Sequence, residues 1–171
     1  MVVGPGTVAG LIPWSLSGWE FRDPMPFWAP VPLQVLGALV LLAGASVLVH
    51  AFVRFAVEGL GTPVPAAPPQ HLVVGGLYRV VRNPMYVALL WAVVGQALLF
   101  GQWSLLVYGA TIWIGFALFV RWREEPVLAR RFGTEYDTYR RAVRAWWPRL
   151  RPWDPSVLGP TRAVGKRGEF G

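Results

Sequence analysis

Long uncharged stretches alternate with short polar segments along this chain. One uncharged stretch runs from Val31 to Val53 and another from Met85 to Val120. At about 1.5 Å per residue, the first can cross a hydrocarbon core about 30 Å thick, whereas the second would make a helix much longer than that. Gly101-Gln102 lies near the middle of the second stretch and is a natural turn. The pattern predicts membrane helices at 31–57, 84–100 and 103–122, the last two forming a hairpin.

Residues 2–19 are also apolar, but glycines and prolines interrupt them, which predicts only a short or partial membrane helix. After the hairpin, apolar and aromatic residues recur every three or four positions from Leu128 to Trp146, with arginines mostly off that stripe. This amphipathic segment should lie on the membrane surface, with a break at Gly133-Thr134. The predicted fold class is therefore an all-α integral membrane protein with three to four membrane helices and a C-terminal amphipathic cytoplasmic helical region.

Composition and charge support this interpretation. Hydrophobic residues make up 54% of the chain and charged residues 15%, against about 25% charged residues in soluble proteins. The absence of Cys excludes disulfides and thiolate chemistry, and two His residues cannot form a three-His site, so no metal site is predicted. The net charge of +7 comes mostly from residues at or after Arg121. Because they directly follow an apolar run, we expect a cytoplasmic membrane face and no nucleic-acid partner.

These patterns divide the chain into three expected regions: N-terminal membrane helices at 1–58, a membrane-embedded region with a loop, the helical hairpin and the amphipathic helices at 59–150, and a polar tail at 151–171. The hairpin places loop 54–84 and the segment after Arg121 on one side of the membrane. Both carry arginines, so the positive-inside rule puts them in the cytoplasm, at a cell inner membrane.

The stretch from Gly75 to Tyr86 then shares a membrane face with Glu124 and Glu125. Its glycines permit close approach of a ligand, and Asn83-Pro84 begins a helix whose free N–H groups favour an anion. Carboxylates and tyrosine rings attract cations. S-adenosylmethionine carries a carboxylate, an ammonium, a sulfonium and a flat ring, and suits such a site. A purely structural arrangement, in which the glutamates pair with arginines and the arginines contact lipid phosphates, is the alternative.

Five motifs follow one another over residues 60–150. Their order and spacing resemble the isoprenylcysteine carboxyl methyltransferase family, to which phospholipid N-methyltransferases are related. The motifs are Leu72-Val73-Val74-Gly75-Gly76-Leu77-Tyr78-Arg79, Arg82-Asn83-Pro84-Met85-Tyr86, Glu124-Glu125, Phe132-Gly133-x-x-Tyr136-x-x-Tyr139 and Trp147-Pro148.

The resemblance implies an S-adenosylmethionine-dependent methyltransferase that acts at the cytoplasmic membrane face on a lipophilic acceptor entering from the bilayer. The acceptor group, a carboxylate, amine, thiol or hydroxyl, stays open. Arg82, Asn83 and Glu125 are the implied catalytic residues. Asn83 stands where eukaryotic members carry His, and Asn cannot take up a proton near pH 7. The implied cofactor-binding residues are His71, Leu72, Val73, Gly76, Tyr78, Arg82, Asn83, Pro84, Tyr86, Glu124 and Glu125.

Two other functions remain open. Sterol reductases share a similar Arg-x-Pro-x-Tyr corner, which would make the chain an NADPH-dependent membrane reductase. The second open function is that of a non-enzymatic scaffold whose arginine-rich tail binds membrane lipids. Binding of S-adenosylmethionine without binding of NADPH would select the methyltransferase.

Overall fold

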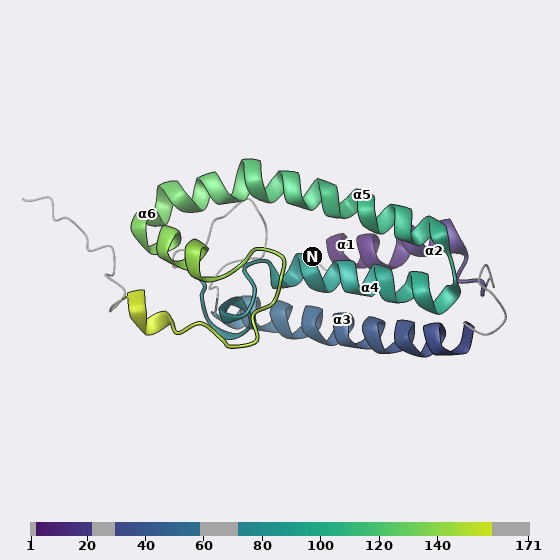
Figure 1. Cartoon of the computed structure of the whole chain (residues 1–171). Helices are drawn as coiled ribbons and strands as arrows, with labels where there is room; N and C mark the ends of the chain where they lie inside the picture. Colours follow the sequence, from purple (N-terminus) through teal and green to yellow (C-terminus); the bar gives the residue numbers. More distant parts are fainter. Residues whose placement is uncertain (1–2, 22–29, 59–71, 159–171) are drawn as a thin grey trace, which may run out of the picture.

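The computed structural model describes residues 3–21, 30–58 and 72–158. Within these ranges the chain forms helices and turns and no strand. Three long helices run roughly parallel or antiparallel to one another: α3 (Pro30–Glu58), α4 (Pro84–Phe100) and α5 (Trp103–Phe119). Figure 1 shows α4 between α3 on one side and α5 on the other.

Length and hydropathy identify the membrane-crossing parts. Val31–Ala51 and the continuous helical run Trp103–Ala142 are each long and apolar enough to span a bilayer, and Pro84–Phe100 is a shorter apolar helix. The apolar part of the second run is α5, and charged residues begin at Arg121. The protein is therefore an all-α membrane protein, as the sequence predicted, with helix bounds close to the expected 31–57 and equal to the expected 84–100.

Small residues allow α3 and α4 to pack closely. A Cβ atom added to Gly44 would lie 2.9 Å from the backbone nitrogen of Ala92, and one added to Gly95 would lie 2.8 Å from the Cα of Leu41. Ala51, seven residues after Gly44, is 1% exposed and continues the contact. Lipid gives apolar side chains little reason to associate, so membrane helices pair where small residues let their backbones meet. The close packing of α3 against α4 fixes the position of α4, whose start lies at the site.

The hairpin between α4 and α5 turns where the sequence predicted. Gly101 ends α4 in the left-handed conformation, with φ 64°, which glycine adopts without steric cost. Gln102 is buried and donates from Nε2 to the carbonyls of Ser17 (2.9 Å) and Glu20 (2.7 Å). The turn therefore also holds the end of the N-terminal segment.

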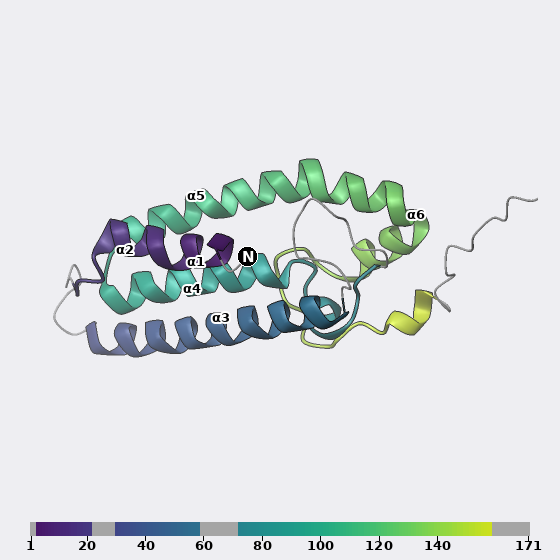
Figure 2. The same ribbon diagram turned by 180° about the vertical axis from the view of Figure 1, so that it is seen from behind.

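The N-terminal segment forms one short helix made of three consecutive pieces: α1 (Val3–Gly6), a π-helical turn (Thr7–Leu11) and α2 (Ile12–Ser17). Pro13 lacks the N–H that would bond to Ala9 in an α-helix or to Val8 in a π-helix. Side chains of the hairpin supply donors to these two carbonyls: Gln96 Nε2 to Ala9 at 2.7 Å, and the Tyr108 hydroxyl to Val8 at 2.9 Å. The partial helix expected near 2–19 thus covers the hairpin end of α4 and α5 (Figure 2).

The end of α5 differs from the sequence prediction. A stop was expected at 122, but the backbone stays helical through a π-helical turn (Val120–Glu124) into α6 (Glu125–Ala142). A helix can continue into the interface, because charged residues are as compatible with it as apolar ones. The predicted break is present at Gly133, whose φ of 49° and ψ of −123° are not helical. The kink brings the second half of α6 back toward the start of α4.

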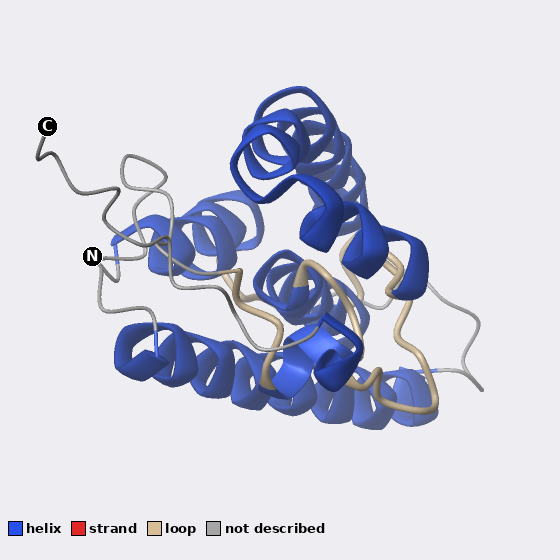
Figure 3. Cartoon of the chain, turned by 90° about the vertical axis from the view of Figure 1, so that its left-hand side faces the viewer, coloured by secondary structure: helices blue, strands red, loops and turns tan. Residues whose placement is uncertain are grey.

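The segment after α6 lies against the loop before α4. Three backbone hydrogen bonds of 2.9 Å join them: Arg82 N–H to the Arg144 carbonyl, Arg149 N–H to Val80, and Trp153 N–H to Arg79. Tyr136, Tyr139, Val143 and Trp153 form a buried cluster beneath this contact, with Leu72 and Val74 packed against it. Seen from this end of the molecule, the loops lie among the helix ends (Figure 3).

Candidate active site

The corner at the start of α4 has the predicted helix start, but the side chain of Asn83 does not cap the helix. Pro84 is buried at the first helical position, and Asn83 makes no side-chain capping bond. Instead, Asn83 Nδ2 donates to the carbonyl of Ala145 at 3.3 Å, which ties the corner to the C-terminal segment. Of the two glycines, Gly76 has a positive φ of 55°, whereas Gly75 is extended with φ −85°. Only Gly76 therefore uses the conformational freedom of glycine.

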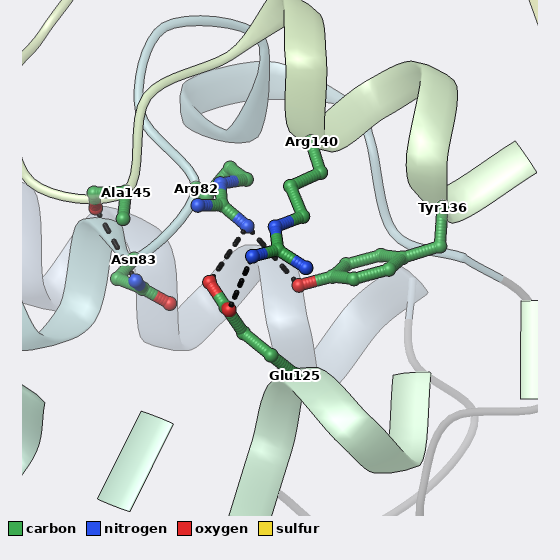
Figure 4. Close-up of polar contacts among 6 residues, drawn as sticks. All are labelled: Arg82, Asn83, Glu125, Tyr136, Arg140 and Ala145. Atoms are coloured by element: carbon green, nitrogen blue, oxygen red, sulfur yellow. Dashed lines mark hydrogen bonds and ion pairs between the residues drawn. The ribbon is translucent and has the colours of Figure 1, made fainter. Parts of the chain in front are cut away.

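Glu125 is the centre of a buried ion-pair group (Figure 4). Its Oε1 lies 3.0 Å from Arg82 Nη1, and its Oε2 lies 3.3 Å from Arg140 Nη2. The same Arg82 nitrogen donates to the Tyr136 hydroxyl at 3.1 Å. Burial, the largest cause, raises the pKa of Tyr136, so the phenol stays protonated. Two guanidinium groups thus compensate the charge of Glu125, and this group joins the loop before α4 to both halves of α6.

Arg82 retains one unused donor. Its Nε is buried and has no hydrogen-bond partner among the residues that the structure describes. A buried unsatisfied N–H of a charged group costs free energy, so such atoms are rare unless a ligand completes them. An anionic group is the natural partner for this donor.

Glu124 differs from its neighbour because no cation pairs with it in the described part of the chain. It accepts a hydrogen bond of 2.6 Å from the hydroxyl of Tyr86. Burial raises the pKa of the Glu124 carboxyl, and the bond from Tyr86 opposes part of that rise. Burial and the charge of Glu124 raise the pKa of Tyr78 to about 12. A cationic ligand group would neutralise this carboxylate, as the arginines neutralise Glu125.

Aromatic rings surround the Tyr86–Glu124 bond. The ring of Tyr86 lies 4.7 Å from that of Phe116 on α5 and 6.4 Å from that of Trp146 in the C-terminal segment. Trp113 meets Trp146 edge to face at 6.4 Å. These distances between ring centroids are typical of favourable aromatic pairs. The faces of such rings attract cations.

Tyr139 fixes the loop on the other side of the site. Its hydroxyl donates to the carbonyl of Tyr78 at 2.7 Å, and its ring packs on Trp153 at 5.5 Å. Burial raises its pKa, so it stays a donor. Leu72 packs against the same buried cluster, and Val73 is partly buried next to it. His71 lies outside the described residues.

The structure thus brings together residues from three distant parts of the sequence. Arg82 contacts Glu125 and Tyr86 contacts Glu124, as expected from the predicted hairpin. The side chain of Asn83 bonds to the C-terminal segment, and the carbonyl of Tyr78 accepts from Tyr139 of α6. The sequence alone did not place Arg140, Phe116 or Trp146 in the site. Arg140 had one usable signal, because it follows Tyr136 by four positions and so shares a helix face with it. Trp146 ended the predicted aromatic stripe, but its contacts and those of Phe116 to Tyr86 are long-range and left no local signal.

Comparison with known proteins gave one match. A family model described as phospholipid methyltransferase matches residues 33–135, which is more than half of the chain. The matched range contains α4, α5, both glutamates and the first half of α6. Searches of curated proteins and of solved structures found no match.

Proposed function

Since the chain belongs to the phospholipid methyltransferase family, and is thus a methyltransferase of membrane lipids, we propose that its methyl donor is S-adenosylmethionine. We place the reaction at the cytoplasmic membrane face of a cell inner membrane. Exposed arginines support this side, because Arg121, Arg123, Arg130, Arg131 and Arg141 all lie at the end of the molecule that holds the site.

The contrast between the two glutamates carries the proposal. Glu125 is already neutralised by two arginines, whereas Glu124 has no cation within the described residues. The same region presents an unused buried N–H on Arg82. A ligand with both an ammonium and a carboxylate, such as the amino-acid end of S-adenosylmethionine, satisfies both groups at once.

The other predicted residues fit the rest of this cofactor. The rings of Tyr86 and Tyr78 offer π faces to a sulfonium, and residues Leu72 to Tyr78 supply backbone groups and apolar surface for a flat ring. Glu125 positions Arg82 and Arg140 through its two ion pairs. Asn83 positions the C-terminal segment through its hydrogen bond to the Ala145 carbonyl.

When bound, S-adenosylmethionine supplies an electrophilic methyl group, whose bond to sulfur breaks as its bond to the acceptor forms. The chain's own groups position the reactants and exclude water, which is the larger share of the work for an in-line transfer. Asn83 uses its amide N–H on Ala145 and cannot serve as a base near pH 7. The reacting group of the acceptor stays open among carboxylate, amine, thiol and hydroxyl.

Calorimetry on detergent-purified protein tests the proposal. S-adenosylmethionine and its demethylated product S-adenosylhomocysteine should bind, and NADPH should not. A thermal melt on the same sample shows that the protein is folded. Binding of NADPH alone would indicate a reductase, and folded protein that binds none of the three would leave only the scaffold.

A further inference from the structure

The packing of α5 changes along its length. Within Trp103–Phe119 only Leu105 and Gly109 are buried, and both lie near the hairpin turn. The N-terminal helix is bonded to this same half of α5, at Tyr108. Toward the site, the ring of Tyr86 on α4 contacts the ring of Phe116 on α5. Most large side chains in the site half of α5 are exposed, namely Trp113, Ile114, Leu118 and Phe119, and in a bilayer these face lipid.

Trp113 lies in this half, and 46% of it is exposed. It follows Tyr108 by five residues and precedes Phe116 by three, so it shares a face with Phe116. Its ring touches Trp146, which in turn touches Tyr86, the residue bonded to Glu124. A continuous row of rings therefore leads from the membrane-facing surface of α5 to the carboxylate of the site.

Trp146, the middle ring of this row, is held in place by the residues before it. The carbonyls of the two residues before it accept hydrogen bonds from the corner, Arg144 from the backbone N–H of Arg82 and Ala145 from Asn83 Nδ2. The tryptophan pair, Trp113 and Trp146, thus joins a membrane helix to a segment that is pinned to the candidate cofactor loop.

We propose that the tryptophan pair binds the phospholipid acceptor, with a hydrocarbon chain of the lipid against Trp113 and the head group directed to Tyr86. This inference rests on the proposed function. The lipid phosphate is negatively charged, and the turn after α5 offers it positive charge. Arg121 and Arg123 are exposed in this turn, which ends at Glu124. Flat indole rings at the membrane interface suit contact with both a chain and a polar head.

Methyl transfer from labelled S-adenosylmethionine to phosphatidylethanolamine in phosphatidylcholine vesicles measures the acceptor KM. Trp113→Ala should raise this KM by about tenfold, the upper end of what an aromatic contact contributes, while the calorimetric Kd of S-adenosylmethionine stays unchanged. Trp113→Phe should restore most of the affinity. Trp103→Ala is the matched control, since Trp103 is 58% exposed on the same helix at the hairpin end.

A second measurement does not depend on the stability of an alanine variant. The chain contains no Cys, so Trp113→Cys can be folded first and then alkylated with a bulky maleimide. Alkylation should raise the lipid KM of the Trp113→Cys protein above its value before alkylation. Alkylation of the Trp103→Cys protein should leave its lipid KM unchanged.

The outcomes separate the two proposals. Failure to bind S-adenosylmethionine would overturn the proposed function. Cofactor binding without transfer to the vesicles would overturn the phospholipid as occupant. Transfer with an unchanged lipid KM in both Trp113 variants would overturn the role of the tryptophan pair.

Discussion

Replacing Glu124 and Glu125 one at a time by glutamine separates their roles. Each substitution keeps the size of the side chain and removes its charge. Glu125→Gln leaves Arg82 without its anion, and the side chains of both are only 11% exposed. Glu124→Gln leaves no cation behind in the described part of the chain, and the glutamine oxygen can still accept from Tyr86.

The structure sets the expected magnitudes. Removing one partner of a buried ion pair costs about 3–5 kcal/mol. Glutamine still accepts one hydrogen bond, and Arg140 is 41% exposed and can turn to water. We therefore expect about 2–3 kcal/mol for Glu125→Gln, a fall in Tm of about 5–10 °C for a chain of this length. Glu124→Gln should change stability by no more than about 0.5 kcal/mol.

Cofactor affinity should respond differently. Loss of a charge-assisted hydrogen bond costs about 1.5–3 kcal/mol, so Glu124→Gln should weaken S-adenosylmethionine binding about tenfold to a hundredfold. Glu125→Gln should weaken it at least about tenfold as well, because Arg82 and Arg140 lose their support. Thermal melts without ligand and calorimetry at a temperature where both variants are folded measure the two effects. Asp137→Asn, an exposed carboxyl on α6, is the control.

Two results would refute this reasoning. A Glu125→Gln protein as heat-stable as the parent chain would show that the ion-pair group does not hold the fold. A Glu124→Gln protein with unchanged affinity would show that this carboxylate does not face the cofactor.

Two further predictions concern helix packing and pH. Gly95→Ala should lower the stability by about 1–3 kcal/mol, because its Cβ would lie 2.8 Å from the Leu41 Cα, whereas Gly115→Ala, with no atom within 4 Å, should be neutral or stabilising in the same thermal melts. Burial raises the pKa of Glu124. As the pH drops through that raised pKa, the carboxylate takes up a proton and the affinity for S-adenosylmethionine should fall. The stability that the protonated Glu124 contributes to the free protein is lost in the opposite direction, as the pH rises through the same pKa. Tyr86→Phe removes the hydrogen bond that opposes the rise and should move the calorimetric midpoint to higher pH, and a midpoint that stays in place would contradict this assignment.

The membrane part of the fold could be predicted because its signals are local. Pro84 and Gly101 bound α4 by their own backbone preferences, and an uncharged run of sufficient length needs no partner to indicate a span. The kink at Gly133 is likewise a property of one residue. The continuation through Val120–Glu124 was not predictable in this way, since charge marks where a helix leaves the apolar region and not where it ends.

The candidate site was predictable only in part. The hairpin alone brings Arg82 and Tyr86 to the two glutamates, and the sequence indicated that meeting. Which glutamate would be neutralised depends on Arg140, whose position follows from the Gly133 kink and from packing of Tyr136 and Tyr139. Asn83 shows the same limit, because its amide bonds a carbonyl 62 residues away instead of capping its own helix.

The bonds from Gln96 and Tyr108 to the N-terminal helix also imply an order of assembly. A carbonyl without a donor is costly in lipid, and Pro13 deprives Ala9 and Val8 of helical donors. The donors that replace them belong to α4 and α5, which are synthesised later. The first segment of the chain should therefore wait at the membrane surface and enter last, once the hairpin has been inserted.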